Sequence, residues 1–166
     1  MINEMQLEID GMGIVFYSEL AIDNITKGDN YFSREYSKPE DVAQHIRKGD
    51  MVGFCTGSAG KYILKFCFGY PDESISKEFP DAIRLAINVV GGAICVLDLF
   101  SLMKWPGDCP QNQKVNIEDG IYHLTASTKL PESGFWGDNQ TIYIHLQKLD
   151  SMPQLSWNGV PYLGGY

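Results

Sequence analysis

The sequence lacks the features that would assign it to a membrane, to a secretory route or to a metal site. No apolar run approaches the roughly 20 residues that a membrane-spanning helix needs. The first four residues have neither the positive start nor the apolar run of a signal peptide. The spacing of Cys55, Cys67, Cys95 and Cys109 matches no zinc pattern. We therefore expect a cytoplasmic protein with reduced cysteines, no bound metal or cofactor, and no membrane partner.

Basic residues are also few. The chain has 13 lysine and arginine residues against 21 aspartate and glutamate residues, which gives a formal net charge of −8. Most of the excess lies in residues 1–83, where 14 acidic residues face 8 basic ones. Because phosphate groups bind to positive surfaces, this charge disfavours nucleic acid and anionic membranes as partners. It is compatible with a basic protein partner, and it leaves the oligomeric state open.

Alternation of apolar and polar residues is the strongest pattern that is present. Hydrophobic residues make up 44% of the chain and aromatic residues 12%, which is enough for a real core. The clearest stretch, residues 114–149, contains two strands of period two around a loop rich in turn-forming residues. About eight such strands occur along the chain. They predict a mainly β fold, either an antiparallel β-sandwich or a flattened barrel.

One short helix interrupts the strands, near residues 39–48. Pro39 suits the first helical position, acidic residues follow it, and Gly49 stands where the helix should end. The length of the chain favours a single domain over residues 1–166. The C-terminal residues 151–166, with two prolines and few charges, are expected to form a tail packed on that domain.

Glycine-rich turns separate many of the strands. We interpret the turns at 57–60, 91–92 and 118–120 as hairpins that join strands adjacent in one sheet. Gly92 and Gly120 are expected to have positive φ, because glycine adopts that conformation without a steric penalty from Cβ.

Two sets of residues have side chains capable of chemistry. His123 and His145 occupy similar places in neighbouring strands, where two imidazoles and a carboxylate could hold a metal. The alternative, which we favour, is that both point to solvent or to a neighbouring hydrogen-bond partner. Three cysteines lie in predicted strands as small buried hydrophobic residues. Cys109 lies in a predicted loop, where we expect it to be exposed, with its pKa raised by the neighbouring Asp108.

The candidate partner-binding residues are loop aromatics and acidic side chains. A tryptophan in a loop can anchor a protein partner, stack on a sugar, or cap the core of the sandwich. Scattered carboxylates could steer a basic partner, and paired ones could act in glycoside hydrolysis. The residues concerned are Trp136, Phe135 and Asp138 in the loop after the first long strand, and Glu35, Glu40 and Asp41 in the acidic half.

Several motifs in residues 83–149 resemble those of known small β proteins. They are Gly91-Gly92-Ala93-Ile94, Asp98-Leu99, Asp119-Gly120-Ile121-Tyr122-His123-Leu124-Thr125, Gly137-Asp138-Asn139-Gln140 and Ile142-Tyr143-Ile144. Together they resemble a group of small uncharacterised bacterial β proteins. The Asp-Gly-x-Tyr-x-Leu-Thr element is also similar to the late hairpin of the competence protein J group. That group consists of compact β proteins that bind and inhibit a nuclease, so the resemblance implies a β fold and a non-enzymatic role.

Size, charge and resemblance together predict a small cytosolic bacterial binding protein. The specific hypothesis is an immunity or inhibitor protein that neutralises a basic toxin or nuclease. The alternative is a carbohydrate-binding or hydrolytic β-sandwich that uses loop aromatics and carboxylates. A pocket with convergent carboxylates would favour this alternative, and a broad acidic surface would favour the inhibitor.

Overall fold

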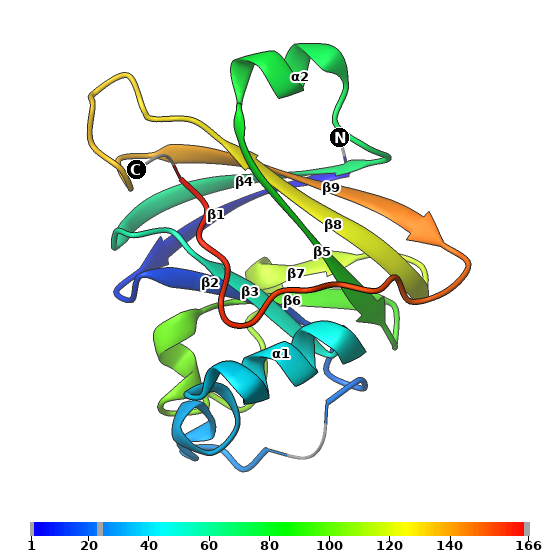
Figure 1. Ribbon diagram of the computed structural model, residues 1–166. Coiled ribbons are helices and arrows are strands. Elements are labelled where there is room, and N and C mark those ends of the chain that lie inside the picture. The colour runs from blue at the N-terminus through cyan, green and yellow to red at the C-terminus, as the bar shows by residue number, and fades with distance from the viewer. Residues whose placement is uncertain (1, 23–24, 165–166) are drawn as a thin grey trace.

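The computed structural model describes residues 2–22 and 25–164, which form two stacked β-sheets (Figure 1). The five-stranded sheet has the order β1-β4-β9-β8-β5, and the four-stranded sheet has the order β3-β2-β6-β7. The mainly β fold class is confirmed, and the two separate sheets make it a sandwich rather than a barrel. In chain order the strands are β1 (Asn3–Ile9), β2 (Gly13–Tyr17), β3 (Met51–Cys55), β4 (Gly60–Phe68), β5 (Asp81–Val89), β6 (Ala93–Asp98), β7 (Lys114–Asn116), β8 (Gly120–Thr128) and β9 (Gln140–Leu149).

Short helical segments lie outside the two sheets. The predicted helix near 39–48 is α1 (Pro39–Lys48), and Gly49 ends it with a φ of 68°. A second helix, α2 (Glu73–Glu78), was not predicted, because it buries none of its residues and so has no apolar periodicity to detect. The remaining segments are single turns: a π-helix η1 (Phe32–Tyr36) and the 3₁₀ turns η2 (Leu99–Leu102) and η3 (Gln111–Gln113).

The core lies between the sheets and is filled from alternate strand positions. Leu124 of β8 lies opposite Leu146 of β9, and Ala126 lies opposite Ile144. All four side chains are buried. The intervening residues, His145 among them, therefore lie on the outer face of the five-stranded sheet, which is turned away from the four-stranded sheet.

All three predicted hairpins are wrong. The turn at 57–60 joins β3 to β4, which lie in different sheets, and the turns at 91–92 and 118–120 also join strands of different sheets. The positive φ expected at Gly92 and Gly120 is confirmed, with values of 78° and 151°. These turns reverse the chain as predicted, but each reversal carries it across the core to the other sheet. One strand pair, β4 with β9, is parallel, and the other strand pairs are antiparallel.

Two segments outside the strands pack against the sandwich. The C-terminal residues 151–164 run across it in extended form (Figure 1), and Leu163 is fully buried while its N–H donates to the carbonyl of Cys55 at 2.8 Å. The connection between β4 and β5 contains α2 and covers part of the outer face of the five-stranded sheet. There the ring of Phe79 meets that of Tyr143 edge-on, with centroids 4.9 Å apart.

Candidate partner-binding site

The loop between β8 and β9, residues 129–139, projects from one end of the sandwich (Figure 1). It contains two tight turns, one closed by a bond from the Gly134 N–H to the carbonyl of Pro131 at 2.9 Å. The second is closed by the Asp138 N–H and the carbonyl of Phe135 at 3.3 Å. The side chain of Phe135 lies between these turns and is 72% exposed. Trp136, next to it, is half-buried.

Buried polar side chains fix the base of this loop. Gln140 is almost fully buried, and its Oε1 accepts a hydrogen bond from the Gly137 N–H at 2.9 Å. Its Nε2 donates to Thr128 Oγ1 at 2.9 Å, and Thr128 in turn donates to the carbonyl of Thr141 at 2.7 Å. The end of β8 and the start of β9 are therefore joined by side chains as well as by the sheet, which restrains the loop.

The loop is also tied to the turn between β3 and β4. Ser58 Oγ donates to the carbonyl of Trp136 at 2.9 Å, and the Lys61 N–H donates to the carbonyl of Gly137 at 2.8 Å. Gly60 and Gly137 pack backbone against backbone, so closely that a Cβ on either would overlap main-chain atoms of the other segment. This close approach requires glycine, and it holds the loop backbone against the β3–β4 turn at Gly137. Phe135, two residues earlier, is therefore presented from a restrained backbone.

A hollow lies on each side of the loop. One of about 370 Å³ has Glu8, Lys61 and Asn139 in its lining. The other, of about 380 Å³, is lined by residues that include Glu132, Asp138 and Asn139. Asn139 borders both hollows and has a φ of 49°, the one positive value outside glycine in the described residues. The two hollows therefore meet at the end of the loop that carries Phe135.

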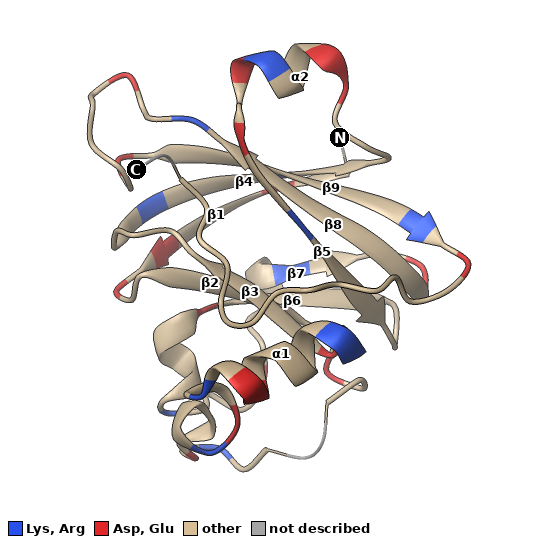
Figure 2. Cartoon of the chain, viewed as in Figure 1, with Lys and Arg blue, Asp and Glu red and all other residues tan. Residues whose placement is uncertain are grey.

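The loop carries acidic side chains without basic neighbours. Glu132 and Asp138 are exposed, and within the described ranges no lysine or arginine lies at ion-pair distance from either. Lys129 at the base of the loop is engaged elsewhere, 2.8 Å from Glu78 and over the ring of Phe79 at 4.7 Å. Figure 2 shows the acidic positions of this loop and of α2 at the same end of the molecule.

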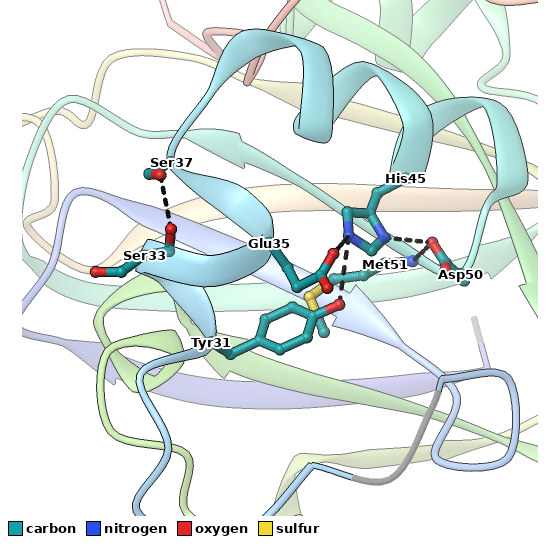
Figure 3. Close-up of polar contacts among 7 residues, drawn as sticks. All are labelled: Tyr31, Ser33, Glu35, Ser37, His45, Asp50 and Met51. Carbon is teal, nitrogen blue, oxygen red and sulfur yellow. Dashed lines mark hydrogen bonds and ion pairs between the residues drawn. The ribbon is translucent and has the colours of Figure 1, made fainter.

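Glu35, by contrast, is half-buried and belongs to a network centred on the buried His45 (Figure 3). His45 is 8% exposed, and its Nδ1 lies 2.8 Å from Asp50 Oδ1, which also accepts the Met51 N–H at 2.8 Å. On the other side, Nε2 lies 3.3 Å from the Tyr31 hydroxyl and 3.7 Å from Glu35 Oε2. The imidazole joins η1, α1 and the start of β3. This network was not predicted from the sequence, where its only local signal is the short separation of His45 and Asp50 around the end of a helix.

The other two acidic candidates lie at the start of α1. Glu40 is exposed and Asp41 half-buried, and both are in the first turn, where the helix dipole favours negative charge. Arg47 and Lys48 occupy the last turn, so α1 has charges of both signs. The helix lies at the opposite end of the view from the loop that carries Phe135 (Figure 1). The structure therefore separates the candidates into two surfaces.

His123 and His145 occupy the outer face of the five-stranded sheet at diagonal positions. His123 Nδ1 lies 2.7 Å from the Tyr70 hydroxyl, and burial lowers the pKa of His145. In residues 2–22 and 25–164 no group of three or more histidine, cysteine or acidic side chains is placed to hold a metal. No helix in this part of the chain is both long and apolar enough to span a bilayer.

The comparisons with known proteins identify the fold. No family model matches the chain, and no curated protein matches it. ComJ from Bacillus subtilis, an inhibitor of the DNA degrading activity of NucA, superposes with a TM-score of 0.53 at 12% identity, covering 89% of this chain and 96% of ComJ. The crocagin biosynthetic protein J gives a TM-score of 0.55 at 11% identity, covering 87% and 95%. This protein thus has the fold of ComJ, as its resemblance to the competence protein J group implied.

Proposed function

We propose that this protein binds and inhibits a partner enzyme, a nuclease or toxin with a basic surface, in the manner of an immunity protein. The observation that carries the proposal is the fold, which extends over 96% of the length of a nuclease inhibitor. A net charge of −8 supports it, because a negative protein attracts a positive partner and speeds the encounter.

The loop at 129–139 is the surface that we assign to this partner. An exposed aromatic ring on a restrained backbone loses little conformational freedom on binding, which is the property of an affinity anchor. Phe135 has this property, and the same loop carries the exposed carboxylates of Glu132 and Asp138, whose charge suits a basic partner. Trp136, the next residue, is half-buried and is joined to the β3–β4 turn through its carbonyl.

The test begins with capture of the partner from extract of the source cell and ends with an activity assay. Wild-type protein and the Phe135→Ala variant are compared, with Phe100→Ala as a matched control because that ring is also exposed but lies in η2. We expect wild type and Phe100→Ala to capture the same basic protein and to suppress its DNA-degrading or toxic activity at equimolar ratio. The Phe135→Ala variant should bind at least about tenfold more weakly, as loss of an anchor costs more than 1.4 kcal/mol.

Two results would count against the proposal. A captured protein whose activity is unchanged by saturating amounts of this chain would exclude inhibition. Equal binding by Phe135→Ala and wild type would remove the assigned surface while leaving inhibition itself intact.

A further inference from the structure

Two of the four cysteines are buried next to each other at the four-stranded sheet. Cys95 is in β6 and Cys109 is in the loop between η2 and η3, and they are 1% and 5% exposed. The expectation of an exposed Cys109 is therefore wrong. Its Sγ lies 3.6 Å from the carbonyl of Gln113, the residue before Lys114, and Lys114 pairs directly with Cys95 across β6 and β7. Gln113 also donates to the carbonyl of Val96 at 2.7 Å, which holds this segment against β6.

Polar groups make the two thiols unequal. Cys95 donates a hydrogen bond to Cys109, which lowers the pKa of the Cys109 thiol, and the Val96 N–H and the Lys114 ammonium act in the same direction. The same hydrogen bond, together with burial, raises the pKa of Cys95. Cys95 Sγ also lies 3.5 Å from Glu19 Oε1, which pairs with Lys114 Nζ at 2.6 Å. The expected rise in the pKa of Cys109 from Asp108 is therefore wrong, because the hydrogen bond from the Cys95 thiol has the largest effect on this pKa and lowers it.

A hollow of about 230 Å³ lies beside this pair, one residue away from each thiol. Its lining includes Glu19, which contacts Cys95, and Asp108, which precedes Cys109 in the chain. Tyr17 and Trp105 form its apolar wall, with ring centroids 5.3 Å apart. The hollow has room for several molecules the size of water, each of which occupies about 30 Å³. Hydrogen peroxide is of similar size, so it fits next to Glu19 and Asp108, and a small displacement of these neighbours would bring it to the thiols.

We propose that Cys95 and Cys109 are a dithiol modification site that hydrogen peroxide oxidises to an intramolecular disulfide. The Cys109 thiolate attacks one peroxide oxygen and the O–O bond breaks, which leaves a sulfenic acid on Cys109 and, after protonation, one water. Cys95 then loses its proton and attacks the Cys109 sulfur. The S–O bond breaks and a second water leaves. Two thiols are oxidised by two electrons and the peroxide is reduced to two waters.

The other two cysteines lack this arrangement and serve as internal controls. Cys55 and Cys67 are half-buried and lie on β3 and β4, which belong to different sheets. Burial raises the pKa of Cys55, so its thiolate fraction at neutral pH is small. Oxidation that follows thiolate character should therefore reach Cys109 before Cys55.

The experiment treats the folded protein with hydrogen peroxide at neutral pH and follows it by intact mass and peptide mapping. We expect the mass to fall by two hydrogens and one cross-linked peptide to contain Cys95 and Cys109, while Cys55 and Cys67 stay free for alkylation. The same product is expected from a Cys55→Ser/Cys67→Ser variant. A disulfide that involves Cys55 or Cys67, or no disulfide after peroxide treatment, would overturn the proposal.

Single variants then test the order of the two steps. With Cys95→Ser, whose hydroxyl keeps a hydrogen-bond donor beside Cys109, the reaction should stop at a sulfenic acid on Cys109, which dimedone labels, because the second thiol is missing. With Cys109→Ala, Cys95 should remain a thiol under the same treatment. Sulfenic acid on Cys95 in that variant would refute the assignment of Cys109 as the attacking thiol. If a variant fails to fold, the proposal is still tested, because the wild-type peptide map alone identifies the disulfide.

Discussion

Leu124 and Ile144 lie midway along β8 and β9, and neither side chain is exposed to solvent. We expect either change to alanine to lower the free energy of unfolding by about 2–5 kcal/mol, because each removes buried methyl groups and leaves a cavity. Lys61→Ala is the control, since the Lys61 side chain is exposed on β4. Urea denaturation measures all three. A loss below about 1 kcal/mol for both core variants would show that these side chains are not packed as described.

His145 predicts a pH dependence of stability. Its side chain is buried on the outer face of the five-stranded sheet, and desolvation lowers its pKa below the ordinary value of 6.5. As the pH falls through about 6.5, the unfolded chain therefore binds a proton at this position before the folded chain does, so the free energy of unfolding decreases. The decrease continues until the pH is below the pKa of the folded state.

The measurement is urea denaturation at several pH values between neutrality and acid. The His145→Gln variant should lose less stability than wild type over this range, because the group responsible is gone. His123→Gln is the comparison: burial also lowers the pKa of His123, but that imidazole is only half-buried and hydrogen-bonds to Tyr70. Parallel pH curves for wild type and His145→Gln would contradict the assignment.

At the residue scale, strand alternation was enough to predict which side chains face the core. Leu124 and Ile144 follow from period two alone, because a strand places successive side chains on opposite faces. The burial of Cys109 could not be predicted in this way, since a loop residue has no period. Its place depends on Gln113 and Val96, which are neighbours only in the folded chain.

Turns at the element scale show the same limit. Gly92 and Gly120 have the positive φ that the sequence predicts, yet β5 and β6 are in different sheets, as are β7 and β8. A glycine turn reverses the chain, and the reversed strand can pair with its predecessor or cross the core. Long-range pairing makes that choice. The parallel pairing of β4 with β9, which residues 69–139 separate along the chain, has no local signal either.

The loop at 129–139 offers two glycines with similar backbone conformation in different surroundings. Gly134 and Gly137 have φ values of 81° and 83°, so alanine is strained by a similar amount at each. A Cβ at Gly134 meets nothing within 4 Å, whereas one at Gly137 lies 2.5 Å from the carbonyl oxygen of Ala59. We expect Gly134→Ala to cost about 1–2 kcal/mol of stability and Gly137→Ala about 1–3 kcal/mol more, because the second change also overpacks the loop base.

Thermal and urea unfolding of the two variants check this difference. Gly137→Ala should also weaken capture of the partner, since it displaces the backbone that positions Phe135, while Gly134→Ala should have the smaller effect. Equal stability of both variants would mean that the contact between the loop and the β3–β4 turn is loose.

At the scale of the whole molecule, the arrangement of charge matters more than its total. The sequence predicts the net charge and the β-sandwich, but not that Glu40 and Asp41 lie far from the loop of Phe135 (Figure 1). Nor does it predict that Glu35 is held by His45. These separations result from the long connection between β2 and β3, which places α1 on its own side of the sandwich.

Charge reversal can determine which surface meets a basic partner. Each reversal of an acidic residue to lysine changes the charge by two, so Glu132→Lys/Asp138→Lys and Glu40→Lys/Asp41→Lys both take the net charge from −8 to −4. General attraction is therefore weakened equally in the two double variants, and any difference between them is local. Glu35 is left unchanged because it contacts His45. A substitution there could alter folding as well as the rate of association, and the two effects could not be separated.

We expect the loop variant to slow association with the captured partner more than the α1 variant does, while dissociation changes little in both. Charges at the rim of an interface act mainly on the encounter. The wild-type association rate should fall as salt rises, because the Debye length shrinks from about 10 Å at 0.1 M to about 3 Å at 1 M, and the loop variant should depend on salt least. Stopped-flow or surface-based kinetics at several salt concentrations measure both rates. If association is slower for the α1 variant than for the loop variant, the partner binds near that helix instead. An association rate that does not depend on salt would exclude electrostatic steering.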